Sequence, residues 1–306
     1  MAKVLIATEK PFSGVAVNGI KEIAAEKGHE IVLLEKYADK AALLEAVADA
    51  EALIIRSDKI DSEVLSAAKN LKIVVRAGAG YDNVDLEAAT ANDVVVMNTP
   101  GQNANAVAEL AFGLIISTIR NSYNGKAGFE LKGKKLGIHA YGNIGKIVAG
   151  IAKGFGMEVF AFDPFVTKEA VEADGVGYIE TVEELYKTCQ FVSLNLPATD
   201  KTKKSINQAL LSTMPANSVL INTARKEVID EEGLAAVLAE KSDFYYTADV
   251  APASAAELKE KYDTRVFFTA KKMGAQTAEA NFNAGIAAIN QISNFLANGD
   301  VTFKVN

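Results

Sequence analysis

A glycine-containing turn near the middle of the chain is the first feature whose residue types and spacing could do chemistry. Residues 135–145 read KLGIHAYGNIG, an apolar strand that turns directly into an amphipathic helix. Gly142 would let the backbone approach a pyrophosphate, and Gly145 would let the helix pack closely on the strand. The helix that opens at Asn143 and Ile144 presents unpaired N–H groups and the positive end of its dipole. The turn therefore predicts binding of a dinucleotide.

Two positions bear on which dinucleotide this turn would bind. Ala140 stands where the first glycine of the G-x-G-x-x-G pattern is expected, and alanine is the smallest replacement. A second strand, residues 158–163, ends in Asp163, which lies 18 residues after Gly145. An acid at this place accepts hydrogen bonds from ribose hydroxyls and repels a 2′-phosphate. The sequence therefore favours NAD over NADP as the cofactor.

Arg225 is the first candidate for catalysis. It follows an apolar strand, residues 219–223, at the carboxyl end where parallel α/β sheets bind their ligands. A guanidinium offers the planar fork that a carboxylate accepts, and hydride transfer to a 2-keto acid needs a cation beside the carboxylate and carbonyl. We therefore expect Arg225 to bind a small 2-hydroxy or 2-keto acid.

The elements that must position these residues follow a regular alternation. Short runs rich in valine and isoleucine alternate with segments of helical periodicity, which is typical of β-α units wound around a parallel sheet. The expected strands are 3–7, 31–35, 52–57, 72–78 and 94–98 in a first series and 136–141, 158–163, 191–196, 219–223, 245–250 and 266–269 in a second. We predict an α/β protein whose second series forms a six-stranded Rossmann domain.

Composition and charge exclude several classes of function. The 306 residues are 49% hydrophobic, and the net charge of −7 with dispersed basic residues argues against nucleic-acid binding. We see no apolar segment long enough to cross a membrane and no secretion-type leader. The single cysteine, Cys189, can form neither an internal disulfide nor a thiolate metal cluster, and we expect it to be a buried apolar residue. These features favour a cytoplasmic protein without a metal.

Three further motifs accompany the glycine turn. They are RAGAGYDNVD at residues 76–85, NTPGQN at 98–103 followed by AEL at 108–110, and NTARKEVID at 222–230. In order and spacing the four motifs resemble the D-isomer-specific 2-hydroxyacid dehydrogenases, and in particular the branch that acts on D-3-phosphoglycerate.

The resemblance implies a fold, an assembly and a division of the chain. Two doubly wound parallel-sheet domains are expected. A Rossmann NAD-binding domain of residues 99–282 would be inserted into a flavodoxin-like substrate domain of residues 1–98 and 283–306. The protein would be a homodimer, although the segment 121–135 is shorter than in relatives, which puts the usual subunit contacts in doubt.

The resemblance also implies roles for individual residues. Besides the turn and Asp163, the cofactor would contact Pro197, Thr223, Ala224 and Asp249. The substrate would contact Arg56, Ser57, Gly78, Ala79, Gly80 and Asn103. The first two of these would supply a cation and a hydroxyl for a phosphate. Two alternatives stay open, because Asn103 could simply cap the following helix and Arg56 could pair with Asp58.

The proton carrier is where this chain departs from the family pattern. Most relatives carry a histidine in a Pro-His-x-Gly segment, held by a glutamate that follows the Asp-Val strand. Here Ser254 stands in place of the glutamate. Alignment on the following Gly-Ala-Gln-Thr segment puts Lys272 at the histidine position, and alignment on the preceding strand gives Lys271. The only histidines are His29, in a turn of surface type, and His139, which we expect in the core. Resemblance to a lysine-bearing subgroup favours Lys272.

A lysine carrier sets the direction of the pH dependence. An ordinary lysine has a pKa of about 10.4 and is protonated at neutral pH unless desolvation or the nearby Arg225 lowers that pKa. Oxidation of a hydroxyl group needs the neutral amine, so it should speed up as the pH rises above neutrality.

The resulting hypothesis is NAD-dependent oxidation of D-3-phosphoglycerate to 3-phosphohydroxypyruvate, the first step of serine biosynthesis. Arg225 would orient the substrate and Lys272 would carry the proton. One alternative is a hydroxypyruvate or glyoxylate reductase. The other is a non-catalytic, NAD-sensing protein similar to a corepressor, because the histidine and glutamate pair is missing.

Overall fold

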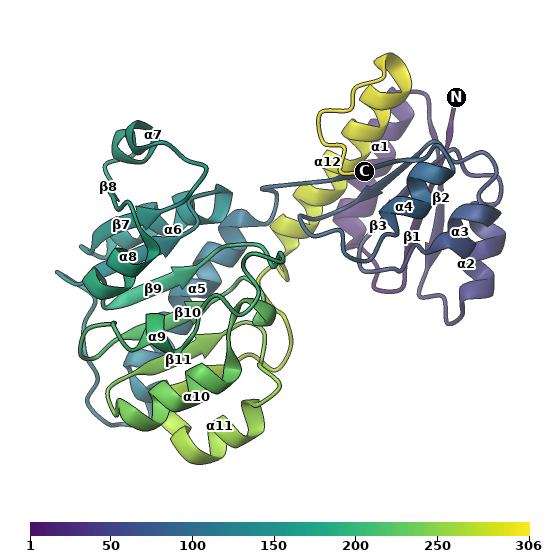
Figure 1. Ribbon diagram of the computed structural model, residues 1–306. Coiled ribbons are helices and arrows are strands. Elements are labelled where there is room, and N and C mark those ends of the chain that lie inside the picture. The colour runs from purple at the N-terminus through teal and green to yellow at the C-terminus, as the bar shows by residue number, and fades with distance from the viewer. The chain divides into compact units, whose positions relative to one another are not determined.

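The computed structural model describes residues 1–306, and the chain forms two compact units (Figure 1). The first unit consists of residues 1–103 and 276–306, and the second of residues 104–275. The sequence suggested boundaries after residue 98 and before residue 283. The second boundary differs because the helix α12 (Ala278–Asn298) is continuous and packs along α1 (Gly14–Glu26), so its first turn belongs to the first unit.

The first unit is built around a parallel sheet with the strand order β2-β1-β3-β4-β5. Its strands are β1 (Lys3–Thr8), β2 (Glu30–Glu35), β3 (Ala52–Ile55), β4 (Ile73–Arg76) and β5 (Val95–Asn98). This is the flavodoxin-like order, as expected. The central strands have helices on both faces and are apolar throughout, since Ile6 lies beside Ile54, which lies beside Val75.

Helices cover both faces of this first sheet. They are α1, α2 (Lys40–Val47), α3 (Ser62–Ala67), α4 (Leu86–Ala91) and α12. Alternate residues of one strand enter different cores: Val4 and Ile6 pack with α1 and α12, whereas Leu5 and Ala7 pack with α2 and α3. The sheet is therefore buried on both faces, and its free edge for ligands is the carboxyl edge.

The second unit has a parallel sheet with the strand order β12-β11-β10-β9-β6-β7-β8. Its strands are β6 (Lys135–His139), β7 (Glu158–Phe162), β8 (Gly177–Tyr178), β9 (Phe191–Leu194), β10 (Val219–Asn222), β11 (Tyr245–Ala248) and β12 (Val266–Phe268). The strand order reverses between β6 and β9, which is the Rossmann arrangement. Six of these strands were expected; the sequence missed β8, because two residues are too short to form an apolar run.

The helices of the second unit also lie on both sides of the sheet (Figure 1). They are α5 (Ala104–Ile119), α6 (Asn143–Gly154), α7 (Lys168–Ala173), α8 (Val182–Thr188), α9 (Gln208–Leu211), α10 (Glu231–Glu240) and α11 (Ala255–Tyr262), with single 3₁₀ turns η1 (Asn121–Tyr123), η2 (Lys226–Val228) and η3 (Asp263–Arg265). The helices α5 and α6 pack on one face, and α8, α9, α10 and α11 contribute to the core on the other.

The single cysteine lies in this second core. Cys189 is fully buried among apolar residues, and burial raises the pKa of its thiol to about 12. It is a buried apolar residue, as the sequence indicated.

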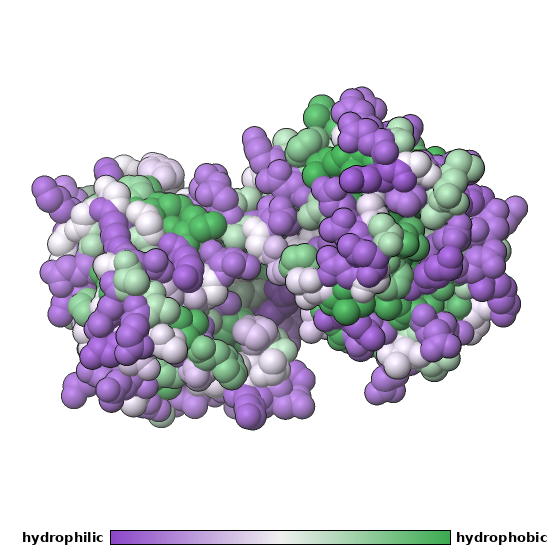
Figure 2. Space-filling model, turned by 90° about the horizontal axis from the view of Figure 1, so that it is seen from above, coloured by the Kyte–Doolittle hydropathy of each residue, from purple (hydrophilic) through white to green (hydrophobic).

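The surface is mostly polar. Figure 2 shows hydrophilic residues over most of the visible face of each unit, with hydrophobic residues between them. None of the helices combines the length and the apolar character that a membrane-spanning segment needs.

Candidate active site

The glycine turn joins β6 to α6. Gly142 is the N-cap residue of α6, has extended backbone, and makes no side-chain hydrogen bond across the helix start. No atom lies within 4 Å of the position that a Cβ on Gly142 would take. A Cβ on Gly145, in contrast, would lie 2.6 Å from the carbonyl oxygen of Ala140 and 3.0 Å from Ile138. Gly145 thus permits the packing of α6 on β6, while Gly142 leaves the helix N-terminus accessible.

Ala140, the first residue of the turn, has a φ of +77°. This left-handed conformation is easy for glycine and costly for other L-residues. The main-chain N–H of Ala140 donates a hydrogen bond of 2.9 Å to the carbonyl oxygen of Phe162, which fixes the turn against β7. The chain therefore makes the tight turn with alanine at a glycine position, under backbone strain.

Asp163 connects the turn to the end of β7. One carboxylate oxygen accepts a hydrogen bond from the N–H of Tyr141 at 2.7 Å, and the other accepts one from the N–H of Phe165 at 2.8 Å. The residue is buried. Each oxygen keeps a further lone pair, so this fixed carboxylate can still accept hydrogen bonds from ribose hydroxyls.

The remaining candidates of the second unit follow the carboxyl ends of neighbouring strands. Pro197 follows β9, Thr223, Ala224 and Arg225 follow β10, Asp249 follows β11, and Lys271 and Lys272 follow β12. Parallel strands end at the same edge of a sheet, so the fold brings these residues to the edge that also carries the glycine turn.

The loop that carries Arg225 is ordered by a buried amide. The side chain of Asn222 accepts a hydrogen bond from the N–H of Ala224 at 3.0 Å and donates one to the carbonyl oxygen of Arg225 at 2.9 Å. Arg225 itself is partly exposed and donates from Nη1 to the carbonyl oxygen of Ala224 at 3.0 Å. Sequence reasoning did not single out Asn222, although a polar residue at the last position of an apolar strand was the available signal.

Asp249 holds the segment that contains the two lysines. Its carboxylate accepts hydrogen bonds from the N–H groups of Met273 at 2.7 Å and Gly274 at 2.8 Å, and from the hydroxyl of Thr269 at 3.1 Å. Asp249 is buried, whereas the side chains of Lys271 and Lys272 are exposed. The acid expected beside the nicotinamide thus also fixes the main chain around both lysines.

Ser254, at the position of the family glutamate, has an acidic partner from another element. Its hydroxyl and its N–H donate to one carboxylate oxygen of Glu231 at 2.7 and 2.9 Å, and the N–H of Ala253 donates to the other at 2.9 Å. Burial opposes ionisation of Glu231, but the hydrogen bonds outweigh burial and lower the pKa of this carboxyl. Glu231 was not identified from the sequence.

His139 lies in the core of the second unit. It ends β6, is buried, and its Nδ1 lies 3.2 Å from the hydroxyl of Tyr186. Burial lowers the pKa of His139 to about 4, so the imidazole is neutral at physiological pH. It is a core residue, as expected.

Two buried polar atoms at this edge support binding of a polar cofactor. The hydroxyl oxygen of Thr223 and the side-chain oxygen of Asn195 are buried and have no hydrogen-bond partner within the protein. Buried polar atoms are almost always hydrogen bonded, so these two atoms fit a polar ligand. Thr223 was an expected cofactor residue, and Asn195, which follows β9, was missed. Together with the accessible start of α6, they fit a dinucleotide.

The substrate candidates lie at the carboxyl edge of the first unit. Arg56 and Ser57 follow β3, residues 78–80 follow β4, and Asn103 is the last residue before α5. The fold therefore brings the residues after β3 and β4 to one edge of one sheet, and assigns all six candidates to the unit that lacks the glycine turn.

The Arg56 guanidinium contacts the chain on several sides. Nη1 donates to the carbonyl oxygens of Lys10 and Pro11, each at 3.0 Å, and Nη2 donates to the side-chain oxygen of Asn281. The carboxylate of Asp58 accepts a hydrogen bond from the main-chain N–H of Arg56 at 3.2 Å. Arg56 therefore pairs with Asp58 through its main chain and not through its guanidinium. The guanidinium instead joins the segment of Lys10 and Pro11 to Asn281 of α12.

The loop after β4 is shaped by an arginine. Gly78 has a φ of +147°, a backbone conformation that favours glycine, and the guanidinium of Arg76 occupies the space beside it that a Cβ would take. Arg76 donates from Nε to the carbonyl oxygen of Arg56 at 2.9 Å, and Asn98 donates to the carbonyl oxygen of Ala79 at 2.6 Å. The loops after β3 and β4 are therefore held together by side chains from neighbouring strand ends.

Comparison with known proteins gives the family. Residues 112–269 match the NAD binding domain of the D-isomer specific 2-hydroxyacid dehydrogenases. The chain belongs to this family. A hydroxypyruvate reductase from Thermotoga maritima is 33% identical over 283 residues, which cover 86% of this chain and 90% of that protein.

Two phosphoglycerate dehydrogenases are also similar to this D-2-hydroxyacid dehydrogenase. The D-3-phosphoglycerate dehydrogenase of Methanocaldococcus jannaschii is 34% identical over 271 residues, or 84% of this chain and 52% of that protein. The chain thus spans about half the length of that relative. The crystal structure of NAD⁺-bound 3-phosphoglycerate dehydrogenase from Entamoeba histolytica has a TM-score of 0.90 and 47% identity, and covers 100% of this chain and 98% of that one.

These relationships confirm three expectations from the sequence. The D-2-hydroxyacid dehydrogenase family, the α/β fold with two parallel sheets, and NAD as the cofactor are all correct.

Proposed function

We propose that this protein oxidises D-3-phosphoglycerate to 3-phosphohydroxypyruvate with NAD, the first step of serine biosynthesis, as a cytoplasmic homodimer. The observation that carries the proposal is the arrangement at the edge of the second sheet, where Arg225 and the lysine segment follow strands that end beside the glycine turn. The 47% identity with a solved phosphoglycerate dehydrogenase supports this substrate.

In the proposed reaction Arg225 binds the substrate carboxylate and the oxygen at C2. Lys272, as the neutral amine, takes the proton of the C2 hydroxyl as the carbonyl forms. NAD, when bound, supplies the acceptor for the hydride that leaves C2. Arg56 and Ser57 bind the substrate phosphate, the guanidinium as a fork and the hydroxyl as a further donor.

Replacement of the two lysines tests the proton carrier. We expect Lys272→Ala to lower kcat for oxidation by about 10²–10⁴-fold, the usual contribution of a general base, while Lys271→Ala keeps most of it. Wild-type oxidation should rise with pH above neutrality, because deprotonation of the amine is required. Full turnover by Lys272→Ala would reject the assignment, and the opposite pattern would give the role to Lys271.

A reductase acting on an unphosphorylated acid is the second candidate, because the hydroxypyruvate reductase relative covers most of this chain. Reduction of 3-phosphohydroxypyruvate and of hydroxypyruvate separates the two functions, since the substrates differ only in the phosphate. We expect kcat/KM to favour the phosphorylated acid, and Arg56→Gln to lower that value by more than about tenfold while leaving hydroxypyruvate reduction unchanged. An equal loss on both substrates would mean that Arg56 acts only through its structural contacts.

A non-catalytic, NAD-sensing protein is the remaining alternative. Steady NADH production from D-3-phosphoglycerate excludes it. NAD binding without turnover on any 2-hydroxy acid would instead support it.

A further inference from the structure

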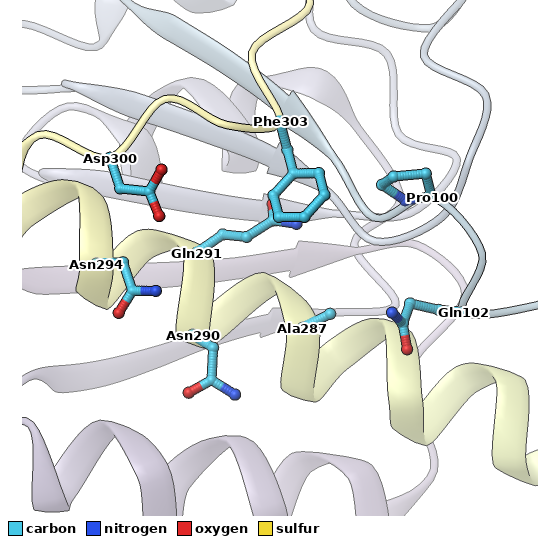
Figure 3. Close-up of a pocket in the computed structure, with 8 residues that line it drawn as sticks. All are labelled: Pro100, Gln102, Ala287, Asn290, Gln291, Asn294, Asp300 and Phe303. Carbon is cyan, nitrogen blue, oxygen red and sulfur yellow. The ribbon is translucent and has the colours of Figure 1, made fainter.

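A small pocket lies in the first unit, outside the strand-end residues described above (Figure 3). Its volume is about 200 Å³. The residues that line it are Pro100, Gln102, Ala287, Asn290, Gln291, Asn294, Asp300 and Phe303. Pro100 and Gln102 lie in the NTPGQN motif, but none of the eight residues was named as a site residue, and none has a part in the proposed dehydrogenase reaction.

Three segments that are far apart in sequence build the walls. Positions 287, 290, 291 and 294 are spaced as one face of α12, and three of the four carry amides. The C-terminal segment turns back at Gly299, which has a φ of +73°, and brings Asp300 and Phe303 to the pocket. Pairing of Lys304 with Met97 fixes this segment beside β5. The pocket is thus a built feature of the fold.

Gln291 is the buried polar group of this pocket. The residue is only 9% exposed, and its amide oxygen is buried with no hydrogen-bond partner. Figure 3 shows the side chain extending from α12 to lie beneath the ring of Phe303. Leaving a buried acceptor unpaired is costly, so this oxygen points to a ligand that brings a donor.

The charge of the pocket limits which ligand fits. Asp300 is the only charged residue in the lining, and no lysine or arginine takes part. One carboxylate oxygen of Asp300 accepts hydrogen bonds from the N–H of Thr302 at 3.0 Å and from its hydroxyl at 2.6 Å. These bonds lower the pKa of Asp300, so it carries a negative charge at neutral pH, and its other oxygen remains available. Phosphates and carboxylates are disfavoured.

We propose that this pocket binds a compact primary ammonium compound with a short apolar body. The ammonium group donates to the free oxygen of Asp300 and to the amide oxygen of Gln291. The apolar body packs against Pro100 and Ala287 and beside Phe303, whose aromatic ring attracts a cation. The volume suits a molecule well below ordinary ligand size, because drug-sized ligands occupy roughly 300–1,000 Å³.

Three probes that share a cyclohexane ring and carry a positive, a neutral or a negative polar group test the class of ligand. Cyclohexylammonium, cyclohexanol and cyclohexanecarboxylate are titrated into the full-length protein and followed by saturation-transfer NMR. We expect cyclohexylammonium to bind at least about tenfold more tightly than the alcohol, and the carboxylate not to bind. Equal binding of the ammonium and the alcohol would overturn the proposal.

Variants locate the binding. Asp300→Asn keeps the turn to Thr302 but removes the charge, and should weaken cyclohexylammonium binding at least about tenfold. Asp93→Asn removes an exposed carboxylate of the same unit and is the matched control, expected to bind as the wild type does. Binding by Asp300→Asn at wild-type strength would contradict the proposal.

Gln291→Leu tests whether the amide of Gln291 binds the ligand or only supports the fold. It removes the unpaired oxygen from a buried position, so the thermal midpoint should stay the same or rise while ammonium binding weakens. Unchanged binding in Gln291→Leu would show that this amide does not face the ligand.

Discussion

The carboxylate of Asp249 accepts a hydrogen bond from the main-chain N–H of Met273 at 2.7 Å. Met273 directly follows Lys272, and the next N–H, from Gly274, donates to the other oxygen of the same carboxylate at 2.8 Å. A buried acid at the end of β11 therefore positions irregular backbone that carries an exposed lysine. Lys272 lies in a segment without helix or strand, so we infer that the contacts of Asp249 help to hold its main chain in place.

Asp249→Asn tests this dependence. An amide group presents its own N–H₂ to one of the two main-chain N–H donors, so at least one hydrogen bond to a charged group is lost. We expect kcat to fall by about 10- to 100-fold, with a smaller change in NAD affinity. Thr269→Val removes only the hydroxyl contact and should cost about fivefold or less. Unchanged kcat with weaker NAD binding would assign the carboxylate to the cofactor alone.

Ala140→Gly should stabilise the protein. The native φ of +77° is unfavourable for alanine and easy for glycine, and part of the gain is offset by the greater freedom of glycine in the unfolded chain. We expect a net gain of about 0.5–1 kcal/mol, measured as a higher urea midpoint. Ala152→Gly, in the buried face of α6, is the control and should lower the midpoint. A lower midpoint for Ala140→Gly would show that the turn is not strained.

The two glycines of the turn should separate binding from folding. Gly142→Ala meets no protein atom and should leave the free energy of unfolding within about 0.5 kcal/mol of wild type. Its Cβ would stand at the helix start, so NAD affinity, measured by calorimetry, should fall by about tenfold or more. Gly145→Ala meets the carbonyl oxygen of Ala140 and should lower stability by about 1–3 kcal/mol. Wild-type NAD affinity in Gly142→Ala would contradict this division.

His139 predicts a loss of stability in mild acid. Burial lowers its pKa from 6.5 to about 4, so below pH 6.5 the unfolded chain binds a proton that the folded chain does not. The contribution of His139 to the free energy of unfolding is fully present above pH 6.5 and declines as the pH falls toward 4. The total loss is about 3 kcal/mol. Urea midpoints at a series of pH values should show this decline in the wild type and not in His139→Gln. Parallel curves for the two proteins would exclude His139 as the cause.

Local features of the sequence determined most of the fold. The apolar runs predicted all five strands of the first sheet and six strands of the second, because a strand buried on both faces is a continuous apolar segment. The glycine turn and the acid at Asp163 indicated NAD, because phosphate and ribose binding depend on residues close in sequence. The strand-end rule brought the Arg225 loop to the same edge as the turn.

The tertiary structure decided how these residues are held. The pairing of Glu231 with Ser254 and of Asp249 with Met273 joins separate loops, so no local pattern reveals these contacts. The same holds for the pocket beside α12, whose walls come from segments almost 200 residues apart in the chain. Hydrophobic periodicity records which face of an element is buried, whereas a hydrogen bond across loops exists only after the strands have set the loops side by side.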